Sequence, residues 1–377
     1  MPEEEDMSSL TDLPHRILET AAKAGIESDN RSRAGSYFHV DDKAVYSTIN
    51  EMFDGKIEIM DVKEALKKHD WLIEYLWNAV KEDADEYTKA VAKDYSGGYF
   101  MRILKGAQID FPLQSCLMLT KKTMHQRIHN IIIAEEGSNA RIISGCVAHP
   151  SVGEGSHYGI SEFYVKKGAY LNFTMVHNWS ENIYVRPRSA AVIDEGGTFV
   201  SNYICMQPVA DLQMYPKAYC RGRGSRAMFN NIIYVGGDSK MSVGSLIDLQ
   251  AEESSGEIVS RNIVKDRAQV SAPARLLGNA SRVKAHMECR GLILNDGASM
   301  SAIPELTSRF KDVDMSHEAA VGKIADKEIN YLMSRGLARD EATSLIVRGF
   351  LDTTIMGLPK NLQDDVDRIV DQLVEGM

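Results

Sequence analysis

The chain has 377 residues, of which 44% are hydrophobic and 25% are charged, a composition typical of a soluble protein with room for two or more domains. Its 53 acidic residues outnumber its 43 basic residues, and the net charge of −10 argues against a general nucleic-acid binder, which needs a basic face. No apolar run approaches the roughly 18 residues of a membrane span, and the acidic N-terminus lacks an export signal. We therefore expect a cytoplasmic protein that binds neither membrane nor nucleic acid.

The five cysteines are scattered, odd in number and free of any Cys-x-x-Cys pair. This pattern disfavours a disulfide framework and a closed structural zinc site, and it fits a reducing cytoplasm. The cysteines occupy positions 116, 146, 205, 220 and 289.

The first hundred residues predict mainly helices. Apolar residues recur with helical spacing over residues 13–24, 62–80 and 84–95, and Ser-Gly-Gly at 96–98 ends the last of these segments. We expect residues 1–100 to form a mainly helical N-terminal domain that acts as a cap and docking surface.

Residues 101–312 have the pattern of an all-β domain. Short runs of β-branched and apolar residues alternate with clusters of turn residues, and no long helical pattern intervenes. Strands without crossover helices favour a sandwich, a barrel or a stacked solenoid. The turn glycines 137, 168 and 197 are 31 and 29 residues apart, a loose period of the size of one solenoid coil. The runs cover residues 131–133, 140–143, 171–176, 198–205, 228–235, 242–249 and 282–294.

Residues 313–377 predict a C-terminal helical domain. Helical spacing over residues 338–355 and 362–373 indicates two amphipathic helices, separated by Gly357 and Pro359. A third helix is expected before them, because residues 282–337 begin as strand-like sequence and end in a helical pattern that Gly336 terminates.

The residues that could carry chemistry lie near this change from strand to helix: Cys289 comes before it, and His317 and Glu318 lie close to it. A thiolate with one nitrogen and one oxygen ligand suits iron or an iron–sulfur cluster. Taken alone, a buried cysteine is more often a small hydrophobe, and a His-Glu pair more often lies on the surface. On a strand His317 and Glu318 would diverge, whereas in a loop both could turn toward one site.

Several ordered motifs resemble the SufB/SufD family, the scaffold subunits of the SUF iron–sulfur cluster assembly machinery. They are Cys289 followed in order by Gly-Leu-Ile-Leu-Asn-Asp, Ala-Ile-Pro-Glu-Leu, Ser-His-Glu-Ala-Ala-Val-Gly-Lys-Ile and Ser-Arg-Gly-Leu, with matches over residues 115 to 360. The resemblance implies a right-handed parallel β-helix at residues 101–312, flanked by the N-terminal and C-terminal helical domains. It also implies a scaffold, rather than an enzyme, for de novo assembly and transfer of iron–sulfur clusters.

The resemblance assigns cluster binding to Cys289, Glu318 and His317. The family segment is Glu-His-Glu in SufB and Ser-His-Gly in SufD, so Ser316-His317-Glu318 combines features of both. One chain offers few ligands, which leads us to expect a homodimer that builds a transient 2Fe-2S or 4Fe-4S cluster at its interface. The alternative is pairing with a SufB/SufD paralogue.

The resemblance also implies a route for sulfur. Cys146 lies in a segment similar to that of the family's persulfide acceptor, and His177 and Trp179 lie in a segment similar to Val-Gln-Asn-Trp, part of the internal route toward the cluster site. Here His177 replaces glutamine, which changes the titration of that position. The family's Phe-Arg-Ile-Asn segment has no clear counterpart near residues 118–125.

ATP hydrolysis is expected from a partner, because the sequence has no Gly-Lys-Ser/Thr phosphate loop. The resemblance implies that a SufC-type ABC ATPase docks on the C-terminal helices. The residues expected at this contact are Arg335, Gly336, Arg348, Gly349 and Phe350.

Two alternatives stay open. The chain could be a SufD-like structural partner without its own cluster, or, in a different class, a β-helical polysaccharide lyase or hydrolase. The latter requires clustered carboxylates beside an arginine or lysine, whereas the acidic residues here fall mostly in turns. The sequence identifies neither the sulfur donor nor a role for a flavin.

Overall fold

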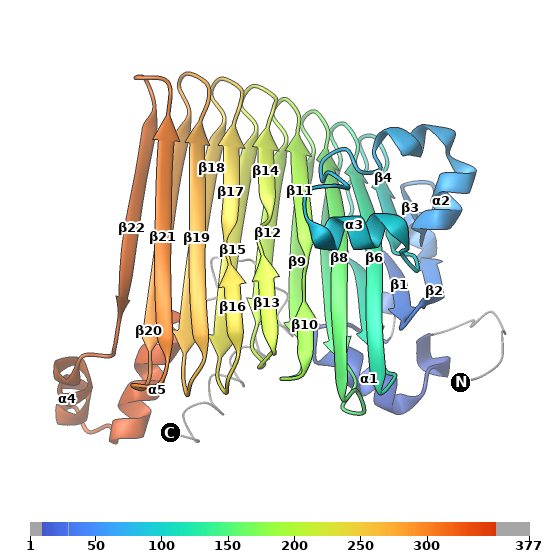
Figure 1. Cartoon of the computed structure of the whole chain (residues 1–377). Coiled ribbons are helices and arrows are strands. Elements are labelled where there is room, and N and C mark those ends of the chain that lie inside the picture. The colour runs from blue at the N-terminus through green and yellow to red at the C-terminus, as the bar shows by residue number, and fades with distance from the viewer. Residues whose placement is uncertain (1–9, 29, 352–377) are drawn as a thin grey trace.

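The chain folds as a parallel β-helix of about eight coils, with helices at both ends (Figure 1). The computed structural model describes residues 10–28 and 30–351. Each coil contributes strand segments to two facing sheets, here called sheet A and sheet B, and turns join the sheets. The predicted parallel β-helix is confirmed, and its core lies between the two sheets.

Sheet A has ten strands, and its neighbours are parallel and in register except in the antiparallel hairpin β1–β2. Its strands in spatial order are β2 (Lys43–Ile49), β1 (Gly35–Val40), β5 (Leu113–Leu119), β7 (Asn139–Ala148), β9 (Tyr170–Asn178), β12 (Thr198–Cys205), β15 (Arg226–Val235), β18 (Ser255–Val264), β20 (Lys284–Ile293) and β22 (Asp314–Gly322).

Sheet B has twelve strands, and several of them are short because one coil can contribute two segments. In chain order they are β3 (Ile57–Asp61), β4 (Tyr99–Ile103), β6 (Thr123–Ala134), β8 (Glu154–Val165), β10 (Ile183–Val185), β11 (Arg188–Ile193), β13 (Asp211–Met214), β14 (Lys217–Cys220), β16 (Lys240–Val243), β17 (Ser245–Leu249), β19 (Gln269–Gly278) and β21 (Ser299–Ser308). The predicted run at 242–249 is thus divided between β16 and β17 at Gly244.

Alternation along each strand sends every second side chain into the core. In β20, Ala285, Met287 and Cys289 are buried in the core, whereas His286 and Glu288 lie on the outer face of sheet A. Because neighbouring strands are parallel and in register, equivalent positions stack into rows that cross the sheet. These rows determine which candidate residues become neighbours.

The turns that lead from sheet B to sheet A repeat the same backbone conformation. Gly137, Gly168, Gly196 and Gly224 have φ angles of 67, 64, 64 and 67°, which glycine adopts without steric cost. The successive spacings of these four glycines agree with the predicted solenoid period. The prediction placed the third turn one residue too late, because Gly196 rather than Gly197 adopts the left-handed conformation.

Sheet B is interrupted between β10 and β11 and between β13 and β14. Pro187 and Pro216 lie at these two interruptions and have no N–H to donate to the backbone ladder. A side chain supplies a donor instead, because Arg188 Nη1 donates to Gln213 O at 2.7 Å. Residues 186–189 together with residues 213–216 form what we call the ladder gap.

Helices and strands of the N-terminal region cover the outer faces of both sheets. The helix α1 (His15–Ala22) packs on sheet A, whereas α2 (Val62–Lys68) and α3 (Glu86–Lys93) cover sheet B (Figure 1). The predicted helices at 13–24 and 84–95 correspond to α1 and α3. The predicted helix at 62–80 is α-helical only as far as Lys68, and the strands β1, β2 and β3 were not predicted.

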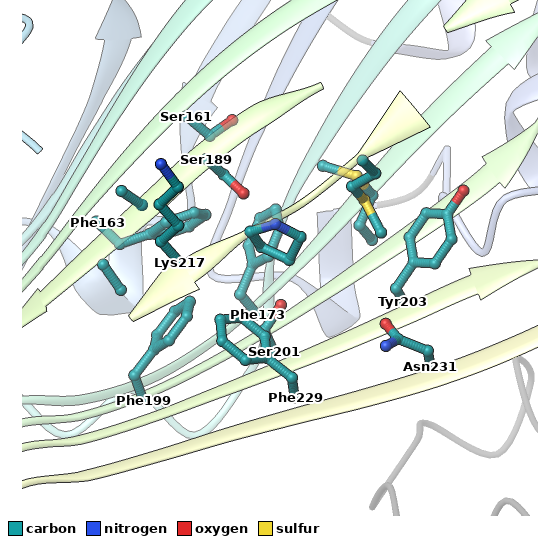
Figure 2. A pocket seen from close by; sticks show the side chains of 15 residues that line it. Ser161, Phe163, Phe173, Ser189, Phe199, Ser201, Tyr203, Lys217, Phe229 and Asn231 are labelled. Atoms are coloured by element: carbon teal, nitrogen blue, oxygen red, sulfur yellow. The ribbon is translucent and has the colours of Figure 1, made fainter. Parts of the chain in front are cut away.

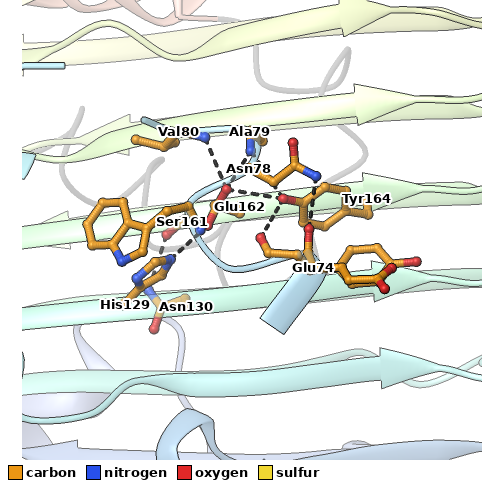
Figure 3. Close-up of polar contacts among 11 residues, drawn as sticks. Glu74, Asn78, Ala79, Val80, His129, Asn130, Ser161, Glu162 and Tyr164 are labelled. Atoms are coloured by element: carbon orange, nitrogen blue, oxygen red, sulfur yellow. Dashed lines mark hydrogen bonds and ion pairs between the residues drawn. The ribbon is translucent and has the colours of Figure 1, made fainter. Parts of the chain in front are cut away.

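The segment after α2 is anchored to sheet B by a buried carboxylate (Figure 3). Glu162 accepts hydrogen bonds from the backbone N–H groups of Trp77, Ala79 and Val80 at 2.6, 2.6 and 3.0 Å. It also contacts His129 Nε2 at 2.8 Å and accepts a hydrogen bond from the Tyr164 hydroxyl at 3.1 Å. The side chains of Glu162 and His129 are both fully buried. This pair was not anticipated from the sequence.

The β-helix continues to Gly322, ten residues beyond the predicted boundary at 312. Two helices follow, α4 (Asp326–Ser334) and α5 (Arg339–Phe350), and Gly336 ends α4 with a φ of 99°, as its position in the sequence predicts. The predicted helix at 362–373 lies outside the described residues. In the part of the chain that the structure describes, no helix combines the length and apolarity of a membrane crossing.

Candidate functional site

Cys289 lies in the core of the β-helix, one strand before β22, the last strand of sheet A that the structure describes. Its side chain is fully buried, and its register partner on β22 is Ala319. Burial and the nearby Glu288 carboxylate raise the pKa of the Cys289 thiol to about 11. In this arrangement the thiol is therefore protonated at neutral pH, whereas binding a metal requires the thiolate.

His317 and Glu318 both lie in β22, so their side chains diverge, as expected for neighbours on a strand. Glu318 is in register with Glu288 on the outer face of sheet A, and Arg290 Nη2 lies 4.0 Å from Glu318 Oε2. His317 is in register with the core residue Met287, but it is exposed because β22 is the last strand.

The three predicted ligands thus occupy adjacent strands but do not converge on one point. Cys289 faces the core and Glu318 faces outward. His317 lies two residues before Ala319, which is the register partner of Cys289. Among the described residues, no group of three or more histidine, cysteine, aspartate or glutamate side chains is arranged to hold a metal ion. A cluster bound by all three residues requires this end of the β-helix to change shape.

Cys146 lies deep in the core, beside His177 in register, and Cys205 follows on the next strand. Burial raises the pKa of the Cys146 thiol to about 12 and that of the Cys205 thiol to about 11. His177 Nδ1 is hydrogen-bonded to the Tyr203 hydroxyl at 3.0 Å, and the Trp179 ring lies 5.5 Å from the imidazole. The structure therefore brings the predicted residues Cys146, His177 and Trp179 together.

A second row of polar side chains continues from this group toward Cys289. Tyr203, Asn231, Ser260 and Cys289 are in register on β12, β15, β18 and β20, and all four side chains are buried. Asn262 flanks this row, and its Nδ2 donates to Ser260 Oγ at 3.0 Å. Buried polar side chains are costly unless they are bonded or functional, so the row is a distinctive feature of this core.

Neutral histidines extend the polar interior toward the N-terminal coils. His157 Nδ1 lies 2.8 Å from Gln126 Oε1, and its ring lies 5.1 Å from that of Trp179. Burial lowers the pKa of His157 to about 3 and that of His39 to about 4, and it also lowers the pKa of His177. These imidazoles are therefore uncharged at neutral pH.

The residues predicted to contact a partner lie at the C-terminal helices. Arg335 and Gly336 follow α4, and Arg335 lies over the Tyr331 ring at 5.3 Å. Arg348, Gly349 and Phe350 form the end of α5. Three large apolar side chains on these helices are 40% or more exposed, which is typical of a protein-docking surface. They are Tyr331, Met333 and Leu345.

A family model described as "SUF system FeS cluster assembly, SufBD core domain" matches residues 117–350, more than half of the chain. The chain belongs to the SufBD family of iron–sulfur cluster assembly proteins. The family motifs that suggested this membership lie mostly in the strands of the β-helix and in α4, which are thus parts of one conserved fold unit rather than isolated matches.

Named SufBD relatives align with nearly the whole chain. An iron–sulfur cluster assembly SufBD family protein of Archaeoglobus fulgidus is 47% identical, with 94% of each chain covered. A homologue from Methanothermobacter thermautotrophicus is 43% identical over 100% of this chain and 92% of its own. The iron–sulfur cluster assembly protein SufB of Bacillus subtilis is 28% identical over 100% of this chain and 82% of its own.

Sequence reasoning missed the residues between Cys146 and Cys289. Tyr203, Asn231 and Ser260 belong to no recognisable motif, and in a strand they resemble solvent-facing positions. The available signal was their alternation with Phe199, Phe229 and Ile258, which places them on the core face.

Proposed function

We propose that this SufBD protein is a scaffold on which an iron–sulfur cluster is assembled and then transferred, with Cys289, Glu318 and His317 as cluster ligands. The observation that carries the proposal is the buried polar row that joins the Cys146 group to Cys289 through Tyr203 and Asn231. A polysaccharide enzyme would have no use for such a row inside its core.

In this proposal, sulfur accepted at Cys146 travels inside the β-helix. Five strand spacings of roughly 4.8 Å separate β7 from β20, about 24 Å in all, so the two thiols are too far apart for direct exchange. His177 and Tyr203 connect Cys146 to the row, and Asn231 and Ser260 supply polar contacts along it.

Cluster binding requires movement of the last coil, β21–β22. In the part of the chain that the structure describes, strands flank this coil on one side only, because sheet A ends at β22. Its residues are mostly exposed, so little packing opposes a shift that uncovers Cys289. Contact with iron would then lower the pKa of the thiol and release its proton.

A second copy of the chain is the partner we propose for the open edge. Among the described strands, none pairs with the outer edge of β22, and such edges readily pair with another strand. A twofold axis at this edge would double each ligand and place two terminal coils side by side. A SufB/SufD paralogue could occupy the same edge in place of a second copy.

A SufC-type ATPase is proposed to bind α4 and α5, through the exposed apolar side chains and the residues around Arg335 and Phe350. Because α4 follows β22 after a short connection, a movement of these helices would act directly on the last coil. ATP binding could in this way couple to exposure of Cys289.

The proposal is tested by anaerobic loading of the purified protein with ferrous iron and sulfide, followed by absorption and Mössbauer spectroscopy. We expect a stoichiometric cluster in the parent and its loss, or a markedly faster decay, in Cys289→Ser. Cys220→Ser is the matched control, because Cys220 is equally buried in the core but lies in sheet B. A parent that takes up no cluster, or a Cys289→Ser variant that retains it as firmly, contradicts the proposal.

A SufD-like structural role is the second candidate, and the complete burial of Cys289 within one chain favours it. The same loading experiment separates the two. A SufD-like protein alone would take up no cluster and would support assembly only when a cluster-binding paralogue is added.

A further inference from the structure

An external groove and an internal cavity meet at the ladder gap of sheet B. The groove holds about 550 Å³ and lies between the 79–88 segment and sheet B. The cavity holds about 20 Å³ between the two sheets (Figure 2). Both are lined by Ser189, Ala190, Met214 and Lys217. The wall that separates them therefore lies at the edge of the ladder gap, where Ala190 and Lys217 are the first paired residues of β11 and β14.

The cavity has a mostly apolar lining that includes four phenylalanines, and its polar side chains could bind one small solute. Its lining includes the polar side chains of Ser161, Ser201, Tyr203 and Asn231. Asn231 is 3% exposed, and within residues 10–28 and 30–351 no hydrogen bond engages its side-chain amide. A space of this size accommodates one water-sized molecule, which needs two to four polar partners. Hydroxyl and amide groups that can donate are available on several sides.

The groove outside the cavity carries an excess of positive charge. Lys81, Arg188 and Lys217 line it, against the single carboxylate of Asp85, which is paired with Arg188. Lys217 also lines the cavity, and Figure 2 shows it beside Ser161 and Ser189, opposite Tyr203 and Asn231. A cleft lined by positive charge raises the local concentration of anions.

The cavity lies on the polar row that ends at the candidate cluster residue. Asn231 and Cys289 are two strand spacings apart, about 10 Å, with Ser260 between them. The distance from Asn231 to Cys289 is less than half the distance of about 24 Å from Cys146 to Cys289.

We propose that the ladder gap is an entrance for hydrosulfide, HS⁻, which is attracted by Lys217, binds in the cavity against Asn231 and reaches Cys289 without passing Cys146. The destination of the anion rests on the proposed function. The entry of a small anion into the cavity does not, and the two can be tested separately.

Bromide tests anion entry, because it is a spherical anion of similar size that anomalous scattering locates in crystals. Crystals of the parent, Asn231→Leu and Lys284→Met are soaked in sodium bromide. We expect an anomalous peak within the cavity of the parent and no peak in Asn231→Leu. Lys284→Met is the control and should keep the peak, because Lys284 lies exposed at the start of β20. An empty cavity in the parent, or an undiminished peak in Asn231→Leu, overturns the inference.

Cluster formation from ferrous iron and sodium sulfide tests the route. In a Cys146→Ser background, we expect Lys217→Met to slow the initial rate about tenfold, as removal of a steering charge does, and Lys284→Met to leave it unchanged. Equal rates in the two lysine variants overturn the entrance. If the parent forms no cluster while bromide occupies the cavity, the proposed function fails and the anion entrance stands.

Discussion

Glu162 connects the N-terminal region to the β-helix through a single buried carboxylate (Figure 3). It accepts three backbone N–H groups and contacts both His129 and the Tyr164 hydroxyl. Burial and this carboxylate raise the pKa of Tyr164, so the phenol stays protonated and donates. A group that only accepts hydrogen bonds is needed here, because the three backbone N–H groups and the Tyr164 hydroxyl all donate to it.

Glu162→Gln replaces one of these acceptor oxygens with a donor amide. We expect the free energy of unfolding to fall by about 1–3 kcal/mol, the usual cost of leaving a buried hydrogen-bonding group without its partner. Urea denaturation at neutral pH measures this, with Glu154→Gln, at the exposed start of β8, as the control. A loss equal to that of the control would show that the carboxylate does not anchor the segment.

The buried His177 makes the free energy of unfolding depend on pH. Burial lowers its pKa in the folded chain below the ordinary value of 6.5, so the unfolded chain binds the extra proton first as the pH falls. The stability that the neutral imidazole provides is therefore complete above about pH 6.5 and decreases by about 1.4 kcal/mol per pH unit below it. We expect His177→Gln to remove this part of the slope.

Urea denaturation of the parent and His177→Gln at pH 7 and pH 5 measures the difference. His15→Gln is the control, because that histidine is exposed on α1. Parallel pH profiles for the parent and His177→Gln would contradict the prediction.

At this scale, the sequence identified residues that carry a motif and missed those defined only by register. Cys146 and Cys289 each lie in a recognisable segment, whereas Asn231 and Ser260 become significant only when β15 and β18 align. The opposite orientations of Cys289 and Glu318 also follow from strand register, which the sequence did not supply because it left the 316–318 segment as strand or loop.

Among the elements, the close approach of β17 and β19 depends on one glycine. A Cβ at Gly244 would lie 2.0 Å from Pro273 O and 2.7 Å from Tyr215 Cδ2. We expect Gly244→Ala to force the strands apart and to cost about 1–3 kcal/mol, as overpacking does. Thermal unfolding measures the loss; Gly322→Ala is the control, since nothing lies within 4 Å of its added Cβ. Equal melting temperatures for the two variants would contradict the prediction.

The strands of the β-helix were largely predictable because β-branched runs and turn glycines alternate with a nearly constant period. The N-terminal strands were not, because helical patterns on either side of residues 35–61 dominated that region. The ladder gap was also missed. Pro187 and Pro216 weaken a strand locally, but the arginine contacts that replace part of the backbone ladder there depend on neighbours a full coil away.

At the scale of the whole molecule, the outer edge of β22, with which no strand within residues 30–351 pairs, predicts self-association. We expect sedimentation velocity to give a species of twice the chain mass for the parent and of one chain mass for Val321→Lys, since a charge on an edge strand opposes pairing. Val321→Thr keeps a β-branched residue there and is the control. A parent that sediments as a single chain at all concentrations would contradict the homodimer.

The two ends of the β-helix differ, and this difference bears on synthesis. The first coil is closed by the β1–β2 hairpin and by β3, whereas no strand up to residue 351 covers the last coil. Because coils contact mainly their neighbours, each new coil can be laid on the preceding one as the chain leaves the ribosome. A chain released early would expose an unpaired edge strand, much as the complete chain exposes β22. Such fragments would therefore compete with complete subunits for the same binding partner.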